Sequence, residues 1–138
     1  MKQMISGALI AIMLMCPFPV NAQMQDAVQI RPILDVTKTS WVALREWEGQ
    51  DLVYFTHLLS WRCGLTKIEY SINSTAADQN WEFTLCNETE ASPSPLTDDI
   101  KIYGNFTLNS VHSITVKITY DDGVQDMVTY ERAAIFIQ

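Results

Sequence analysis

The sequence has few of the residues from which metal and nucleotide sites are built. It contains two histidines, three cysteines and five glycines. Paired His, Cys, Asp or Glu ligands at zinc-like spacing are absent, and so is the calcium-loop pattern D-x-[DN]-x-[DN]-G. No glycine-rich phosphate loop occurs. We therefore expect no metal and no cofactor.

Catalytic motifs are also scarce. His57 and His112 lie far apart in the sequence, and each falls in a predicted strand, where a structural role is the simpler interpretation. There is no G-x-S-x-G motif and no other nucleophile signature. The sequence favours a protein that is not an enzyme, although a serine–histidine–acid site stays open, because a sequence alone does not show which side chains meet.

Basic residues are outnumbered. The chain has 9 Lys and Arg against 16 Asp and Glu, a formal net charge of −7. Without residues 1–22, which hold Lys2 and no acid, 16 acids remain against 8 bases, a net charge of −8. Nucleic acids and anionic membrane surfaces are bound through cationic clusters. The charge balance therefore disfavours both as partners, without identifying one.

The only long apolar run stands at the N-terminus and predicts export. One basic residue, Lys2, precedes an apolar run over residues 5–15, and two prolines and the small residues Val20 and Ala22 follow. This is the pattern of a signal peptide over residues 1–22. The run is also short of the roughly 20 residues of a membrane-spanning helix. We expect no membrane span after signal removal.

Two alternatives compete with that interpretation of the N-terminus. The segment could be retained as an N-terminal anchor, or Cys16 could be a lipoprotein processing site. Met15, which precedes Cys16, is bulkier than such processing usually requires.

The remaining cysteines predict one disulfide. Cys63 and Cys86 form an even pair in a chain expected to reach an oxidising compartment. The bond would stabilise the fold by about 3 kcal/mol in the chain-entropy treatment of loop closure. The alternative is a reactive thiol at Cys63 with its pKa lowered by Arg62. The absence of a C-x-x-C motif favours the disulfide.

Short alternating runs of β-branched and aromatic residues dominate the rest of the chain. After a flexible lead-in at residues 23–28, a single domain over 29–138 is expected to be all-β. Asp121, Asp122 and Gly123 are the best hairpin turn. The segments with a strand pattern are 30–36, as an edge strand, then 41–47, 52–61, 67–72, 81–86, 100–108, 112–120, 124–131 and 133–137.

Such a pattern is typical of a β-sandwich or a small barrel. We predict an immunoglobulin-like β-sandwich of seven to eight short antiparallel strands with one disulfide. The chain departs from the immunoglobulin pattern at one point, because Cys63 and Cys86 are closer together than the cysteines that link two facing sheets.

Tryptophans supply the main functional indication. If Val42 and Leu44 point into the core, Trp41 and Trp47 are displayed outward, close to Arg45. Exposed aromatic rings on a sheet can bind sugar rings or a protein partner. Alternatively, the rings cover the core or a sheet edge. The candidate binding residues are Trp41, Arg45, Trp47, Trp61 and Arg62.

We therefore expect a non-catalytic binding module, monomeric or weakly associating, that recognises another exported protein or an envelope glycan. One alternative is a small secreted hydrolase or an enzyme inhibitor, for which the mobile, exposed loop at 87–99 would be the inhibitory segment. Another is a structural subunit of an envelope assembly that pairs through the predicted edge strand 30–36.

Two stretches carry a resemblance. Residues 59–72 and the run ITVKITYDDG from Ile114 to Gly123 resemble those of small exported proteobacterial proteins of no assigned function. The resemblance covers most of the chain after the signal peptide. It implies a periplasmic location, or secretion, and brings no site residues.

Overall fold

The computed structural model of the protein describes residues 26–86 and 93–138. The predicted signal peptide and residues 23–25 lie outside this range. Three short helices are present: α1 (Ala27–Val36), α2 (Thr56–Ser60) and α3 (Arg132–Ile135). Two 3-10 turns are η1 (Lys38–Ser40) and η2 (Arg62–Gly64). The strands are β1 (Ala43–Trp47), β2 (Gln50–Tyr54), β3 (Leu65–Ile72), β4 (Gln79–Asn80), β5 (Tyr103–Thr107), β6 (Ser113–Tyr120) and β7 (Gln125–Glu131).

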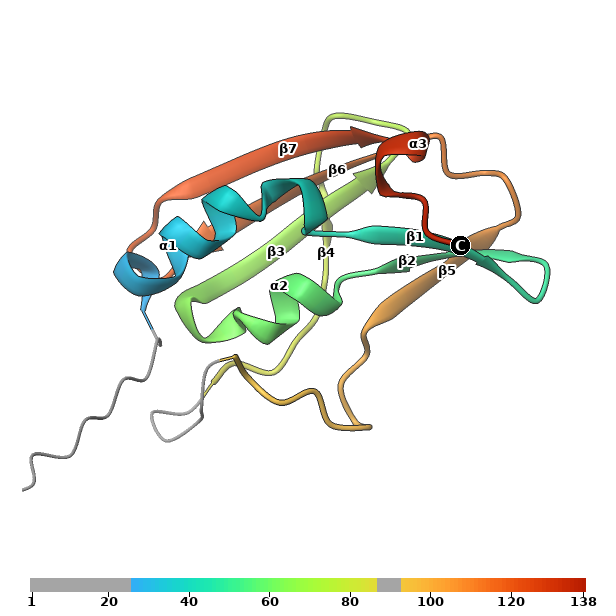
Figure 1. The fold of residues 1–138 in the computed structure, drawn as a ribbon. Coiled ribbons are helices and arrows are strands. Elements are labelled where there is room, and N and C mark those ends of the chain that lie inside the picture. The colour runs from blue at the N-terminus through green and yellow to red at the C-terminus, as the bar shows by residue number, and fades with distance from the viewer. Residues whose placement is uncertain (1–25, 87–92) are drawn as a thin grey trace, which may run out of the picture.

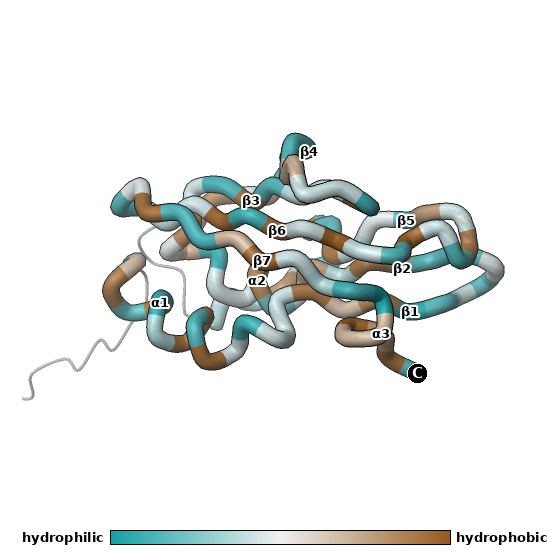
Figure 2. The backbone as a smooth tube through the Cα atoms, turned by 90° about the horizontal axis from the view of Figure 1, so that it is seen from above, coloured by the Kyte–Doolittle hydropathy of each residue, from teal (hydrophilic) through white to brown (hydrophobic). Residues whose placement is uncertain are grey.

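The strands form two antiparallel sheets. The smaller sheet has the order β1-β2-β5, and the larger has the order β4-β3-β6-β7. The two views in Figures 1 and 2 show α1, α2 and α3 on one face of β3, β6 and β7, with the small sheet at one end. The core lies between that face and the helices, which contribute Ile30, Leu34, Leu58, Leu59 and Ile135 to it.

The chain is thus mostly β and antiparallel, with seven strands among the described residues. This confirms the coarse prediction from the sequence. The immunoglobulin-like arrangement is not confirmed and stays a prediction. Residues 27 and 28, grouped with the lead-in by the sequence, form the first turn of α1.

The predicted edge strand at 30–36 is wrong, because these residues belong to helix α1. Asp26 caps the helix by accepting a hydrogen bond from the Gln29 backbone. Ala27, Ile30 and Leu34 are buried at helical spacing. Pro32 costs one backbone hydrogen bond, and burial of the apolar stripe outweighs that cost.

The strands predicted at 67–72, 112–120 and 124–131 are confirmed as β3, β6 and β7. On β6, Ile114, Val116 and Ile118 are fully buried on one face. The turn predicted before β7 is present, with Gly123 at φ +84°. A bulge between Leu65 and Lys67 shifts the register of β3.

Three other predicted strands differ from the structure. Residues 52–61 divide into the end of β2 and helix α2. Leu58 and Leu59 are both buried, which adjacent residues of a strand with one buried face cannot be, because they point to opposite faces. Residues 133–137 are mostly α3, followed by a single parallel bridge from Phe136 to Leu44 in β1. Residues 81–86 form no strand, and the short β4 precedes them.

Candidate functional site

Trp41 is a core residue. Its exposed fraction is 0%, and its indole Nε1 donates to the carbonyl of Leu34 at 2.9 Å. The expected outward display of Trp41 is therefore wrong. The strand alternation does not reach it, because Trp41 ends η1 in a helical conformation and β1 starts two residues later.

Arg45 and Trp47 do form the outward pair that the sequence indicated. Leu44 of β1 is fully buried, and its neighbours on the strand point the other way. The Arg45 guanidinium carbon lies 4.2 Å from the centroid of the Trp47 ring. Trp47 stays half exposed, at 50%. The cation and the ring thus form one accessible surface on the small sheet.

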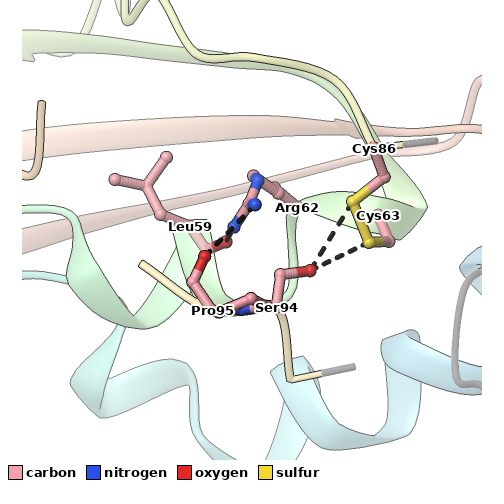
Figure 3. The surroundings of a disulfide bond; sticks show 6 residues. All are labelled: Leu59, Arg62, Cys63, Cys86, Ser94 and Pro95. Carbon is pink, nitrogen blue, oxygen red and sulfur yellow. Dashed lines mark hydrogen bonds between the residues drawn. A yellow bond between two sulfur atoms is a disulfide. The ribbon is translucent and has the colours of Figure 1, made fainter. Parts of the chain in front are cut away.

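Trp61 and Arg62 belong to a different environment. Arg62 is only 4% exposed and donates to the carbonyls of Leu59 at 2.9 Å and Pro95 at 3.3 Å (Figure 3). Trp61 packs, partly buried, against the core. The structure does not bring either residue to the Arg45–Trp47 surface.

The cysteine pair is oxidised, as predicted. Cys63 and Cys86 form a disulfide with a sequence separation of 23. The hydroxyl of Ser94 lies 2.9 Å from Cys63 Sγ and 3.5 Å from Cys86 Sγ (Figure 3). In this state Cys63 carries no thiol, and the bond joins η2 to the segment after β4.

The predicted inhibitory loop lies partly outside the described residues, which exclude 87–92. Most residues of its described part, 93–99, are exposed as expected, and Ser94 is the point at which this part is anchored to the fold. Ser94 is 3% exposed, and its backbone N–H donates to the carbonyl of Ser60 at 2.6 Å.

A groove opens beside Arg45, between η1, β1 and the start of α2. Its volume is about 520 Å³, within the range of small-molecule sites, roughly 300–1,000 Å³. We call it the Arg45 groove. It is lined by Ser40, Trp41, Val42, Ala43, Arg45, Tyr54, Thr56, His57, Ser60 and Ile137.

His57 presents a defined hydrogen-bonding state to this groove. Its Nε2 lies 2.8 Å from Thr37 Oγ1, and the Thr37 hydroxyl donates its own hydrogen to the carbonyl of Ile33 at 2.7 Å. His57 must therefore be the donor at Nε2, which leaves Nδ1 as the acceptor of the neutral ring. Burial lowers the pKa of His57 and favours that neutral form.

Hydroxyl groups and a second aromatic ring complete the lining. Tyr54 stands at the end of β2, and its ring centroid lies 5.3 Å from that of Tyr103 on β5. The Ser60 hydroxyl donates to the carbonyl of Thr56 at 3.0 Å and keeps its lone pairs for another donor. The groove therefore combines aromatic surface, hydrogen-bonding groups and one cation.

Sequence reasoning missed Tyr54, His57 and Ser60 as members of a site, because it extended a single strand through them. A signal was available. Phe55, Leu58 and Leu59 are apolar at the i, i+3, i+4 spacing of a helix, which turns the intervening polar residues to the other side.

The hydrolase alternative required a histidine beside both an acid and a hydroxyl. Within the described residues His57 bonds to a hydroxyl, that of Thr37, and to no carboxylate. In that same part of the chain, no three His, Cys, Asp or Glu side chains gather to hold a metal ion. None of the helices described there has the length and hydropathy that a bilayer-spanning helix needs.

Comparison of the chain with protein-family models, curated proteins and solved structures finds no match. The resemblance to small exported proteobacterial proteins therefore stays a prediction. The candidate residues are placed by the geometry of this chain alone.

Proposed function

We propose that this protein is an exported binding module of the bacterial periplasm, and that its ligand is an envelope glycan held in the Arg45 groove. The observation that carries this proposal is the composition of the groove. The Tyr54 ring, the neutral imidazole of His57 and a set of hydroxyls line it together with Arg45, and Arg45 in turn contacts the exposed ring of Trp47. A sugar ring has an apolar face and polar edges, and this lining offers a partner for each.

Export is supported by two features of the chain. The N-terminal pattern over residues 1–22 is that of a signal peptide. The Cys63–Cys86 disulfide is a bond that persists in oxidising compartments.

A glycan is favoured over a protein partner by the shape of the site. A stable protein interface buries about 800 Å² on each partner, usually around a cluster of anchoring aromatic residues. Here Trp47 is the one exposed tryptophan among the described residues, and it contacts Arg45, which lines a concave groove. A narrow polar ligand fits this arrangement better than a protein surface does.

The test measures retention of the mature protein on purified envelope glycan. Trp47→Ala and Tyr54→Ala should each weaken binding at least tenfold while the protein stays folded by circular dichroism. Met127→Ala is the matched control, because Met127 is 52% exposed on β7, against 50% for Trp47. This control variant should bind like the native chain.

Three outcomes would overturn the glycan proposal. One is the absence of retention on any envelope glycan. Another is equal weakening by Met127→Ala. The third is periplasmic crosslinking that captures one specific protein through Trp47, which would replace the glycan with a protein partner.

A further inference from the structure

Arg45 differs from most other cations of the protein in its partners. Arg31, Lys38 and Arg132 each pair with a carboxylate at 2.5–2.8 Å, and Lys67 and Lys117 share Glu69. Within the part of the chain that the structure describes, Arg45 forms no ion pair and contacts the Trp47 ring instead.

Two of the three acids in the β1–β2 hairpin, Glu46 and Asp51, are already engaged. Arg132 holds both oxygens of Asp51, at 2.7 Å and 3.0 Å, and Glu46 at 2.8 Å. Asp51 is fully buried and also accepts the backbone N–H groups of Asn109 and Val111 at 3.1 Å. These two carboxylates therefore cannot neutralise Arg45 without breaking a network that joins β2 to α3.

The groove itself contains no acid. All of its lining residues are neutral except Arg45 and the titratable His57, in a chain whose formal net charge is −7. The groove is thus a local site of positive charge on an acidic protein. Arg45 is the permanently charged residue in this lining, and a ligand that sits in the groove comes within the Debye length of about 8 Å at physiological ionic strength.

Stacking on Trp47 prepares the guanidinium for a carboxylate. With the Arg45 guanidinium carbon 4.2 Å from the ring centroid, the indole restrains the side chain. The N–H donors of a guanidinium lie in its plane and can bind both oxygens of a carboxylate at once. The ordering of a long side chain, usually a cost of binding, is thereby reduced.

We propose that the Arg45 groove selects acidic saccharides, with the sugar carboxylate bound by Arg45. This inference rests on the proposed function, since it names the class of glycan that the groove takes. The sugar ring lies against Tyr54, and its hydroxyls meet Nδ1 of His57 and the hydroxyl of Ser60. No covalent step is involved.

The test compares a hexuronic acid oligosaccharide with the same oligosaccharide as its methyl ester, by isothermal titration calorimetry. The acid should bind the native protein at least tenfold more tightly than the ester. Arg45→Gln should reduce binding of the acid to the level of the ester, and change binding of the ester less than threefold. Arg45→Lys should retain part of the preference, because it keeps the charge and loses the planar donors.

Lys101 provides a matched control. Its ammonium lies 5.1 Å from the Trp81 ring centroid, so it is also a cation over a tryptophan, but it does not line the Arg45 groove. Lys101→Gln should leave the preference for the acid unchanged.

The results separate this inference from the proposed function. Equal binding of acid and ester by the native protein would overturn the inference and leave a glycan-binding groove. A preference that Arg45→Gln leaves intact, or that Lys101→Gln removes, would also overturn it. Binding of neither form, nor of any other glycan, would overturn the proposed function. If Arg45→Gln does not fold, the difference in affinity between acid and ester, measured in the native protein and in Arg45→Lys, still tests the inference.

Discussion

At the scale of residues, three arginines have three different tasks. Arg132 neutralises two acids, and Arg62 donates to carbonyls inside the fold. Arg45 stacks on an exposed ring beside a groove. Their sequence contexts do not separate them. The sequence named both Arg45 and Arg62 as candidate binding residues, and the arrangement of their neighbours in space separates the accessible Arg45 from the buried Arg62.

Asp51 yields a prediction about stability. Its carboxylate is fully buried and accepts four hydrogen bonds. Asp51→Asn should lower the free energy of unfolding by about 3 kcal/mol, the lower end of the range for removing one partner of a buried ion pair, because Arg132 keeps some access to water. Urea unfolding measures this loss.

Asp51 also makes the stability of the protein depend on pH. The hydrogen bond from Arg132 is the main reason why the pKa of Asp51 lies below its usual value. The stabilisation is therefore present above the unfolded pKa of about 3.9, and is lost as the pH falls through the folded pKa. The difference in stability between the native protein and Asp51→Asn should narrow as the solution is acidified below that point.

Glu46→Gln is the control for both measurements. Glu46 contacts the same guanidinium but is exposed, and such pairs contribute roughly 0–1 kcal/mol. If Glu46→Gln costs as much stability as Asp51→Asn, burial is not what makes the Asp51 network important.

At the scale of elements, the disulfide holds an irregular segment in place. It ties η2 to the segment after β4, next to Ser94. Replacing both Cys63 and Cys86 by Ser should reduce the free energy of unfolding by about 3 kcal/mol, from the loop-closure entropy of a 23-residue separation. Urea unfolding of the variant, and of the native protein with and without reductant, measures this.

The reduced native protein should match the double serine variant. A loss below about 1 kcal/mol would contradict the loop-closure explanation. It would indicate that the contacts around Ser94 hold the segment without the covalent bond.

Strong alternation explains which elements were predictable. β3, β6 and β7 follow from the sequence because one face of each packs on the core and the other is polar or exposed. The turn was predictable because an Asp-Gly pair favours a tight hairpin, and Gly123 does adopt the left-handed conformation, with φ +84°. These features are local, so a sequence carries them directly.

The helices were missed for reasons that are also physical. In α1, Pro32 and β-branched residues favour a strand by propensity, and burial of Ile30 and Leu34 overrides that preference. Gly64 matters here too. A Cβ at that position would overlap the Ile30 side chain and lie 3.0 Å from the backbone carbon of Asp26. Because glycine has no Cβ, α1 can approach η2 closely.

The candidate site was predictable only in part. Arg45 and Trp47 follow from the alternation of one strand. Tyr54 and His57 join them through strand pairing and through the start of α2, which are long-range consequences of the fold. Trp41 shows the limit, because two residues outside the strand its direction is no longer set by parity.

At the scale of the whole molecule, an acidic chain places a cationic groove beside its small sheet. The helices cover one face of the larger sheet (Figures 1 and 2) and occupy much of the surface that could otherwise bind a partner. The small sheet at the other end keeps Arg45, Trp47 and Tyr103 accessible.

We propose the Arg45 groove as the ligand site of the whole molecule. Titration of the isotope-labelled mature protein with hexuronic acid oligosaccharides, followed by two-dimensional nitrogen–proton NMR, tests it most directly. Shifted signals should concentrate in residues 40–47 and 54–60 and include the Trp47 indole N–H. Saturable shifts confined to β6 and β7, or no shifts with any envelope glycan, would contradict it.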